Sequence, residues 1–137
     1  MERISTRIHG VIDYATALIL IVVPLMFLFG GAGADAGSTA STAAWVLIVA
    51  GLALLGLSLK TRYELGAVRV VPMRAHLAAD IGLGAILVVS PWLFGFASLI
   101  WWPHVLVGLM EIVLGVTTRR RSPVETPATA VAEQGAR

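Results

Sequence analysis

Four long runs of apolar residues, separated by short polar segments, constrain this chain more than any other feature of its sequence. The runs are Val11–Phe29, Ala43–Leu59, Leu77–Phe96 and Leu99–Thr118. Each contains roughly 17–20 residues, about what a helix needs to cross the ~30 Å hydrocarbon layer of a membrane. Only helices and closed barrels satisfy their backbone hydrogen bonds in that layer, and these runs lack the alternation of barrel strands. We therefore predict an all-α bundle of four transmembrane helices.

The composition favours lipid over water as the surrounding solvent. Of the 137 residues, 58% are hydrophobic and 13% are charged, whereas soluble domains carry about 25% charged residues. A globule of this length could not bury so much apolar surface in its core. The basic residues fall in short clusters between the runs and form no continuous basic face, so we expect no nucleic-acid partner. The absence of cysteine excludes disulfides and thiolate metal sites.

The distribution of Lys and Arg predicts the orientation of the bundle. None of them lies in the segments Gly30–Thr42 and Ala97–Ile100, and all lie in the terminal segments and the loop Lys60–Arg74. By the positive-inside rule, both termini and this loop are expected on the cytoplasmic side of the cell membrane. The tryptophans map to the opposite, outer interface, which amphipathic rings prefer. We expect Gly30–Thr42 to be a flexible outer loop and the tail 122–137 to be disordered.

The chain contains two tandem copies of one two-helix unit. A shift of 67 positions superimposes a polar motif and a proline: Arg7 on Arg74, His9 on His76, Asp13 on Asp80, and Pro24 on Pro91. The second helices match at a shift of 59. We predict repeats at 4–62 and 71–121 within one domain, 1–121. Because each copy has two spans, the copies enter the membrane the same way, related by a parallel pseudo-two-fold axis along its normal.

The tripeptide Ser90-Pro91-Trp92 closes the motif of the second copy, with Asp80 eleven residues before the proline. In this the chain resembles the SPW repeat family, small bacterial integral membrane proteins named for that tripeptide. The first copy departs from it, because only Pro24 is retained there. The resemblance covers roughly residues 4 to 120. It implies a membrane-bound two-helix repeat, with no established activity and no catalytic residues.

The polar motif places ionisable groups just before and inside the first and third predicted spans. His9 and Asp13 are four residues apart, so they share one helix face, and His76 and Asp80 repeat the arrangement. Such groups are costly in a bilayer and usually face the bundle interior or water. If the first and third helices meet, the four side chains converge. They can then ligate a divalent metal, relay protons or, through the two His, hold haem.

The same residues also fit a structural role, which is the favoured interpretation of the sequence. An Asp in the first two turns of a helix interacts well with the positive end of the helix dipole. Arg7 and Arg74 lie one to two turns away and can pair with the Asp of the other repeat while reaching the membrane interface. Such ion pairs would fix the packing of the helices.

Glu111 is a second candidate site inside the membrane. It lies about eight residues, or ~12 Å, from the inner end of the fourth run. The shift of 59 gives it Leu52 as its counterpart. A lone carboxyl at that depth is expected to be neutral or paired, which makes it a candidate proton or cation site. A hydrogen bond across a helix interface is the alternative.

Three residues toward the outer side are expected to have structural roles. Pro24 and Pro91 each remove a backbone hydrogen bond in the outer third of a helix and should kink it there. His104, beside Pro103, is expected to be solvated.

The sequence contains no nucleophile elbow, P-loop, dinucleotide fingerprint or zinc-protease motif, so we lean against an enzyme. The favoured hypothesis is a non-enzymatic scaffold or interaction protein of the cytoplasmic membrane. One alternative is a small transporter or proton- or metal-binding protein that uses the His/Asp cluster and Glu111, as a homo-oligomer. The other is a haem-binding redox protein with His9 and His76 as ligands. The sequence leaves the metal and the cofactor unknown.

Overall fold

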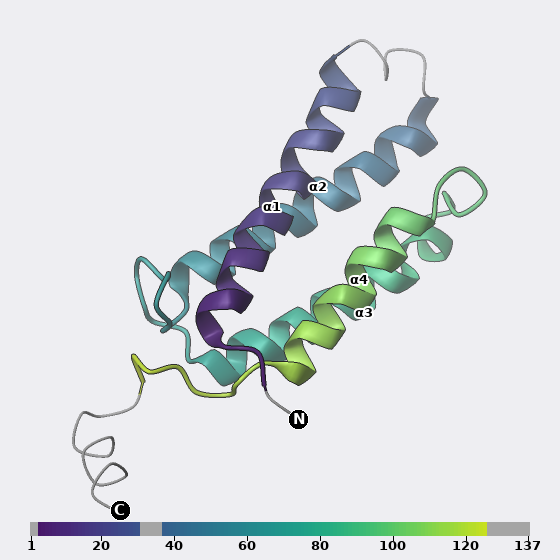
Figure 1. Ribbon diagram of the computed structural model, residues 1–137. Coiled ribbons are helices and arrows are strands. Elements are labelled where there is room, and N and C mark those ends of the chain that lie inside the picture. The colour runs from purple at the N-terminus through teal and green to yellow at the C-terminus, as the bar shows by residue number, and fades with distance from the viewer. Residues whose placement is uncertain (1–2, 31–36, 126–137) are drawn as a thin grey trace, which may run out of the picture.

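The computed structural model describes residues 3–30 and 37–125, and this part of the chain is all-helical. The predicted fold class is confirmed. The helices, labelled in Figure 1, are α1 (Thr6–Phe29), α2 (Gly37–Lys60), α3 (Met73–Leu93) and α4 (Trp102–Thr117).

The helices differ in how well they suit a membrane span. By length and composition, α1, α2 and α3 can each cross a membrane, whereas α4 is apolar but has only 16 residues. At ~1.5 Å per residue this is about 24 Å, less than the ~30 Å hydrocarbon layer. The predicted run began at Leu99, but Leu99–Trp101 belong to the connection, and Pro103 stands in the first turn of the helix, where proline is favoured. Four spans therefore remain a prediction.

Two predicted boundaries are wrong because local capping extends the helices. The Ser5 side chain accepts a hydrogen bond from Ile8 N–H and starts α1 earlier than the apolar run does. Helix α2 begins at Gly37, inside the predicted outer loop. The hydroxyls of Ser41 and Thr42 donate to carbonyls four residues earlier, which makes these polar residues compatible with a helix. The rest of the predicted loop, 31–36, lies outside the described residues.

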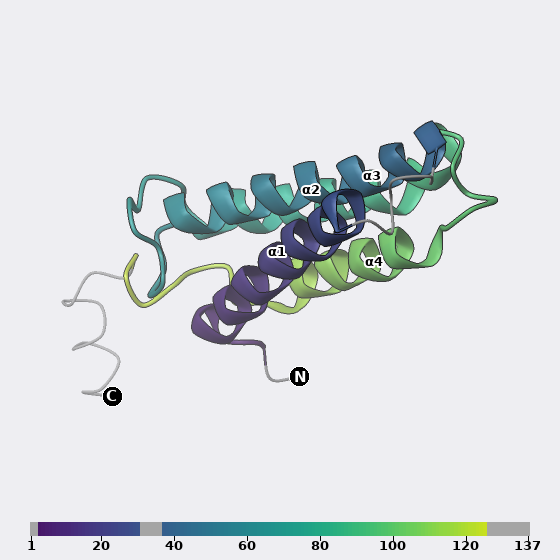
Figure 2. The same cartoon turned by 90° about the horizontal axis from the view of Figure 1, so that it is seen from above.

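The four helices form two hairpins. Helix α1 packs along α2, α3 packs along α4, and a smaller contact joins α2 to α3. Figures 1 and 2 show that α1 and α3 begin at the same end of the molecule, and that α2 and α4 end there. The residues at this polar end therefore come from both hairpins.

Backbone hydrogen bonds join the hairpins at this end at matched positions. Ile4 pairs with Thr118, and Val71 pairs with Thr61. Ile4 and Val71 are 67 positions apart, and Thr61 and Thr118 are 57 apart. In each case the residue before one hairpin pairs with the residue after the other. These matched contacts favour the predicted pseudo-two-fold relation, but with a shift of 57 for the second helices in place of 59.

Both prolines lie within helices. Helix α1 continues for five residues past Pro24, to Phe29. Helix α3 ends two residues past Pro91, whose carbonyl accepts hydrogen bonds from Phe96 and Ala97. The kink at each proline stays a prediction. The first residues of the predicted tail are described: Ser122 is buried, and Glu125 accepts a hydrogen bond from Met73 N–H at 2.9 Å. Residues 126–137 lie outside the described part.

The closest approach of α3 and α4 is at two glycines. A Cβ on Gly84 would lie 2.5 Å from the carbonyl oxygen of Gly108, and a Cβ on Gly108 would lie 2.5 Å from that of Gly84. Neither backbone oxygen can move without separating the helices. The second hairpin therefore depends on the absence of a side chain at both positions.

We expect Gly84→Ala to lower the free energy of unfolding by about 1–3 kcal/mol, because the methyl group must push α4 away. Gly82→Ala on the same helix is the matched control, since nothing lies within 4 Å of a Cβ there. Alanine's better helix propensity should leave the control unchanged or up to ~1 kcal/mol more stable. Thermal unfolding in detergent measures both variants, and equal losses would contradict this packing.

Candidate metal centre

The four side chains of the repeated polar motif meet inside the bundle, at the polar end. His9 and Asp13 lie in the first turns of α1, and His76 and Asp80 lie in the first turns of α3. All four are fully buried, and one donor atom from each lies within 4.8 Å of the other three. Since α1 and α3 belong to different hairpins, the cluster joins the two halves of the molecule.

The two histidine nitrogens lie close to each other and to one oxygen of each aspartate. The Nε2 atoms of His9 and His76 are 3.0 Å apart. Asp13 Oδ2 lies 3.3 Å from the first and 2.9 Å from the second, and Asp80 Oδ2 lies 3.2 Å from each. In a tetrahedral zinc site with bonds of about 2.0–2.1 Å, neighbouring ligand atoms are about 3.3–3.4 Å apart. The two nitrogens and two oxygens lie close enough together to hold one divalent transition-metal ion.

Hydrogen bonds behind the imidazoles orient them toward this point. The Thr61 hydroxyl donates to the Leu57 carbonyl at 2.7 Å, so its oxygen accepts from the Nδ1–H of His76 at 2.8 Å. With its proton on Nδ1, the neutral His76 ring has its lone pair on Nε2. The matching contact joins Thr118 Oγ1 to His9 Nδ1 at 3.0 Å. Each threonine belongs to the hairpin opposite to that of its histidine.

The two carboxylates are held differently. Ser58 donates to Asp13 Oδ2 at 3.0 Å, whereas its counterpart at the shift of 57, Gly115, has no hydroxyl. Within the described part of the chain, Asp13 Oδ1 and both Asp80 oxygens have no hydrogen bond. The imidazoles at ion-pair distance are therefore the main polar surroundings of Asp80. Buried carboxylate oxygens without donors favour a cation beside them.

Charge neutrality also favours a divalent cation. Two carboxylates in an apolar interior require two positive charges, because an uncompensated charge there is costly. Two protonated imidazoles would supply them, but two Nε2–H groups would then face each other across 3.0 Å. One proton shared by the Nε2 atoms leaves the four-residue cluster with a net negative charge. A divalent ion held by these four residues would supply both positive charges and accept the lone pairs of both imidazoles, as the ion does in structural zinc sites.

Haem fits this geometry less well. Two histidines on opposite faces of a haem place their nitrogens about 2 Å from the iron, hence about 4 Å apart. Here the Nε2 atoms of His9 and His76 are 3.0 Å apart. The oxygens of Asp13 and Asp80 also lie where the porphyrin ring would have to pass.

The two arginines of the repeated motif do not join the cluster. Arg7 and Arg74 are both exposed. Among the described residues, the ion-pair partners of Asp13 and Asp80 are the two histidines. The expected Asp–His contacts are present, and the expected Arg–Asp pairs are not formed. Each arginine stands two residues before its histidine and therefore points to the exposed side of the helix, whereas the histidine and the aspartate share the buried face.

Glu111 lies near the four-residue cluster but is not one of its members. It is fully buried, and neither of its oxygens has a hydrogen bond to any described residue. Its Cβ would lie 3.2 Å from a Cβ on Gly84, one turn beyond Asp80 on α3. The shift of 57 gives it Leu54 as its counterpart, not Leu52. Burial agrees, because Leu54 is fully buried and Leu52 is 54% exposed.

His104 is not solvated, contrary to expectation. It is fully buried, its Nε2 donates to the Ala43 carbonyl at 3.1 Å, and its ring centroid lies 4.7 Å from that of Phe96. The connection between α3 and α4 folds Phe96 over the imidazole and removes it from solvent. The sequence also gave no reason to select Thr61 and Thr118. Both are threonines that directly follow the second helix of a repeat, 57 positions apart. An alignment at a shift of 59 does not pair them.

A family model, the SPW repeat domain, matches residues 7–118. The chain belongs to the SPW repeat family. The matched region extends from α1 to the end of α4 and contains all four residues of the cluster. No curated protein and no solved structure matches the chain.

We expect Thr61→Val and Thr118→Val each to cost about 1–3 kcal/mol of unfolding free energy, because a buried histidine Nδ1 loses its partner. Thr117→Val is the matched control, since Thr117 is exposed and donates within its own helix. It should change stability by less than about 0.5 kcal/mol. Chemical denaturation in detergent gives all three values. A Thr117 variant as unstable as the other two would remove the special role of the buried pair.

Proposed function

We propose that this protein is a non-enzymatic membrane protein whose two helical hairpins are joined by one divalent transition-metal ion. The ligands are His9, Asp13, His76 and Asp80, and Zn²⁺ fits them best. One observation carries the proposal: two imidazole nitrogens and two carboxylate oxygens are fully buried, and each nitrogen lies 2.9–3.3 Å from the other nitrogen and from both oxygens.

The choice of metal follows from the ligand atoms. Imidazole suits Zn²⁺, Cu²⁺, Fe²⁺ and Ni²⁺, whereas Mg²⁺ and Ca²⁺ prefer sites made wholly of oxygen. Zn²⁺ takes histidine nitrogen and aspartate oxygen ligands in four-coordinate sites, so it suits this set of four donors. Two neutral histidines, two carboxylates and one divalent ion also give a centre with no net charge.

The position of the centre suggests its role. Helices α1 and α3 come from different hairpins, whose direct helix–helix contact is mainly between α2 and α3. A metal held by α1 and α3 would add a second connection between the two hairpins. Its binding energy would then stabilise one arrangement of the hairpins. This agrees with a scaffold or interaction protein whose shape depends on the metal.

Metal titration of purified, metal-free protein tests the proposal. We expect one Zn²⁺ per chain by isothermal titration calorimetry and elemental analysis, and a higher unfolding temperature with Zn²⁺ bound. Asp13→Asn and Asp80→Asn should each weaken binding at least ~10²-fold, because a charged ligand is lost from a four-ligand site. Glu111→Gln is the matched control, since it alters a buried carboxyl that is not one of the four proposed ligands.

Two outcomes would contradict a metal centre. One is a folded wild-type protein that takes up no divalent metal. The other is equal metal binding in the Asp80→Asn variant and the wild type. Either result would leave the cluster as a hydrogen-bonded structural element.

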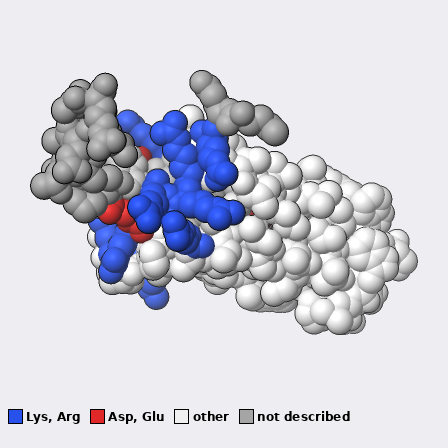
Figure 3. Space-filling model, turned by 90° about the horizontal axis from the view of Figure 1, so that it is seen from below, with Lys and Arg blue, Asp and Glu red and all other residues white. Residues whose placement is uncertain are grey.

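We also infer that the polar end of the molecule faces the cytoplasm, with the chain in the cytoplasmic membrane. Figure 3 shows Lys and Arg gathered at one end, while the rest of the visible surface is almost free of charge. The positive-inside rule places such an end on the cytoplasmic side. Both termini and the loop between α2 and α3 would then be cytoplasmic.

Cysteine labelling tests this orientation, because the natural chain contains no cysteine. Val68→Cys places a thiol in the α2–α3 loop at a position that is 63% exposed. Ser98→Cys places one in the exposed α3–α4 connection at the other end. In intact cells, an impermeant maleimide should label position 98 and spare position 68. The reverse pattern would invert the topology.

Ion movement is a second candidate function, and Glu111 is the observation that favours it. This carboxyl is fully buried and without a hydrogen bond to the described residues, about one turn beyond Asp80. An ion path from the cluster past Glu111 would need further helices to line it, and a homo-oligomer would supply them. In proteoliposomes, Glu111→Gln should then abolish proton or metal flux and preserve metal binding. A wild-type protein without flux would leave only the static metal centre.

A further inference from the structure

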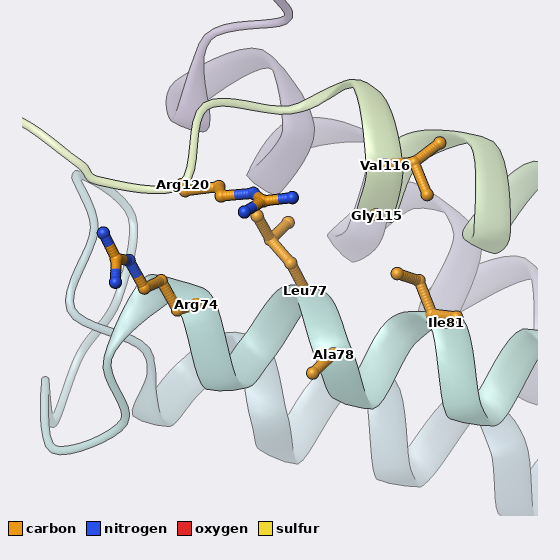
Figure 4. Close-up of a pocket in the computed structure, with 7 residues that line it drawn as sticks. All are labelled: Arg74, Leu77, Ala78, Ile81, Gly115, Val116 and Arg120. Carbon is orange, nitrogen blue, oxygen red and sulfur yellow. The ribbon is translucent and has the colours of Figure 1, made fainter.

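A groove between α3 and α4 combines two arginines with an apolar floor. It has a volume of about 210 Å³ and lies at the polar end of the second hairpin. Figure 4 shows Arg74 in the first turn of α3 and Arg120 on the segment that follows α4, with the Arg120 side chain reaching over Leu77. Leu77, Ile81 and Val116 continue the lining toward the middle of the helices.

The two arginines of this groove have no ion-pair partner among the described residues. Both arginines are exposed, and neither guanidinium forms an ion pair with a carboxylate of residues 3–30 or 37–125. Guanidinium groups are well matched to phosphate, to which they donate two parallel hydrogen bonds. Two of them beside an apolar surface therefore suit a ligand with a phosphate at one end and a hydrocarbon chain at the other.

The first hairpin fills the corresponding place with its own side chain. The shifts of 67 and 57 give Leu77 and Arg120 the counterparts Gly10 and Tyr63. Tyr63 is fully buried, and a Cβ on Gly10 would overlap its ring. Burial raises the pKa of the Tyr63 phenol, so a neutral ring fills this place. The second hairpin replaces that ring with an arginine and leaves the groove open.

We propose that this groove binds one anionic phospholipid, with its phosphate between Arg74 and Arg120 and one acyl chain along Leu77, Ile81 and Val116. The groove lies where the headgroup region of a membrane would meet the polar end of the bundle. Basic pockets between membrane helices on the cytoplasmic side commonly hold anionic headgroups. The site is distinct from the metal centre and does not depend on it.

Native mass spectrometry of the protein in a neutral detergent tests the proposal, with phosphatidylglycerol as the probe and phosphatidylcholine as the neutral reference. We expect one phosphatidylglycerol per chain at low lipid concentration. The double variant Arg74→Ala, Arg120→Ala should weaken its binding at least ~10-fold, because two charge-assisted contacts are lost. The matched control is Arg7→Ala, Arg119→Ala, which removes two exposed arginines outside the groove and should weaken binding less than ~2-fold.

A third variant separates a lipid from free phosphate. Val116→Trp fills the apolar floor and keeps both arginines; Val116 is 58% exposed, so the larger side chain does not disturb the core. Phosphatidylglycerol binding should fall in this variant. Unchanged binding, competition by inorganic phosphate at similar concentration, or equal losses in the two arginine double variants would each overturn the proposal. Thermal unfolding of every variant confirms that it is folded.

Discussion

Two histidines and two aspartates, buried together in an apolar interior, impose the constraint on which the rest of this structure depends. Buried ionisable groups are tolerated only when they compensate one another or bind a cation. Each pair must therefore face the other, and this fixes how α1 lies against α3. The crossed backbone contacts of Ile4 with Thr118 and of Val71 with Thr61 support the same junction. The hydroxyls of these two threonines then hold the imidazoles.

The two repeats are alike where they build the centre and different where they do not. His, Asp and the supporting Thr occur in both copies. In contrast, Ser58 of the first copy corresponds to Gly115 of the second, and Tyr63 corresponds to Arg120. The first difference leaves Asp80 with fewer hydrogen bonds than Asp13. The second leaves an open basic groove on one hairpin only. The two copies thus share the buried cluster, while the second copy alone has the groove that we propose as a lipid site.

Much of this architecture could be predicted from the sequence. The apolar runs gave the helices, and the spacing of four residues put each His–Asp pair on one helix face. Other features depended on details that hydropathy does not contain. The Ser5 cap and the hydroxyls of Ser41 and Thr42 moved helix boundaries into polar sequence. The supporting threonines lie at or just beyond the ends of the apolar runs, where hydropathy gives no reason to select them. The expected Arg–Asp pairs do not form among the described residues, because the packing brings the histidines to the carboxylates instead.

The proposed metal centre would give the fold and the proposed function one physical cause. A neutral, four-ligand centre would stabilise the junction of the hairpins and leave no position for a substrate, which agrees with a protein that is not an enzyme. Zinc K-edge X-ray absorption of the purified, zinc-loaded protein tests this claim most directly. The account predicts four nitrogen and oxygen ligands at about 2.0–2.1 Å, with outer-shell scattering from two imidazoles. A spectrum of six oxygen ligands without imidazole scattering would contradict it.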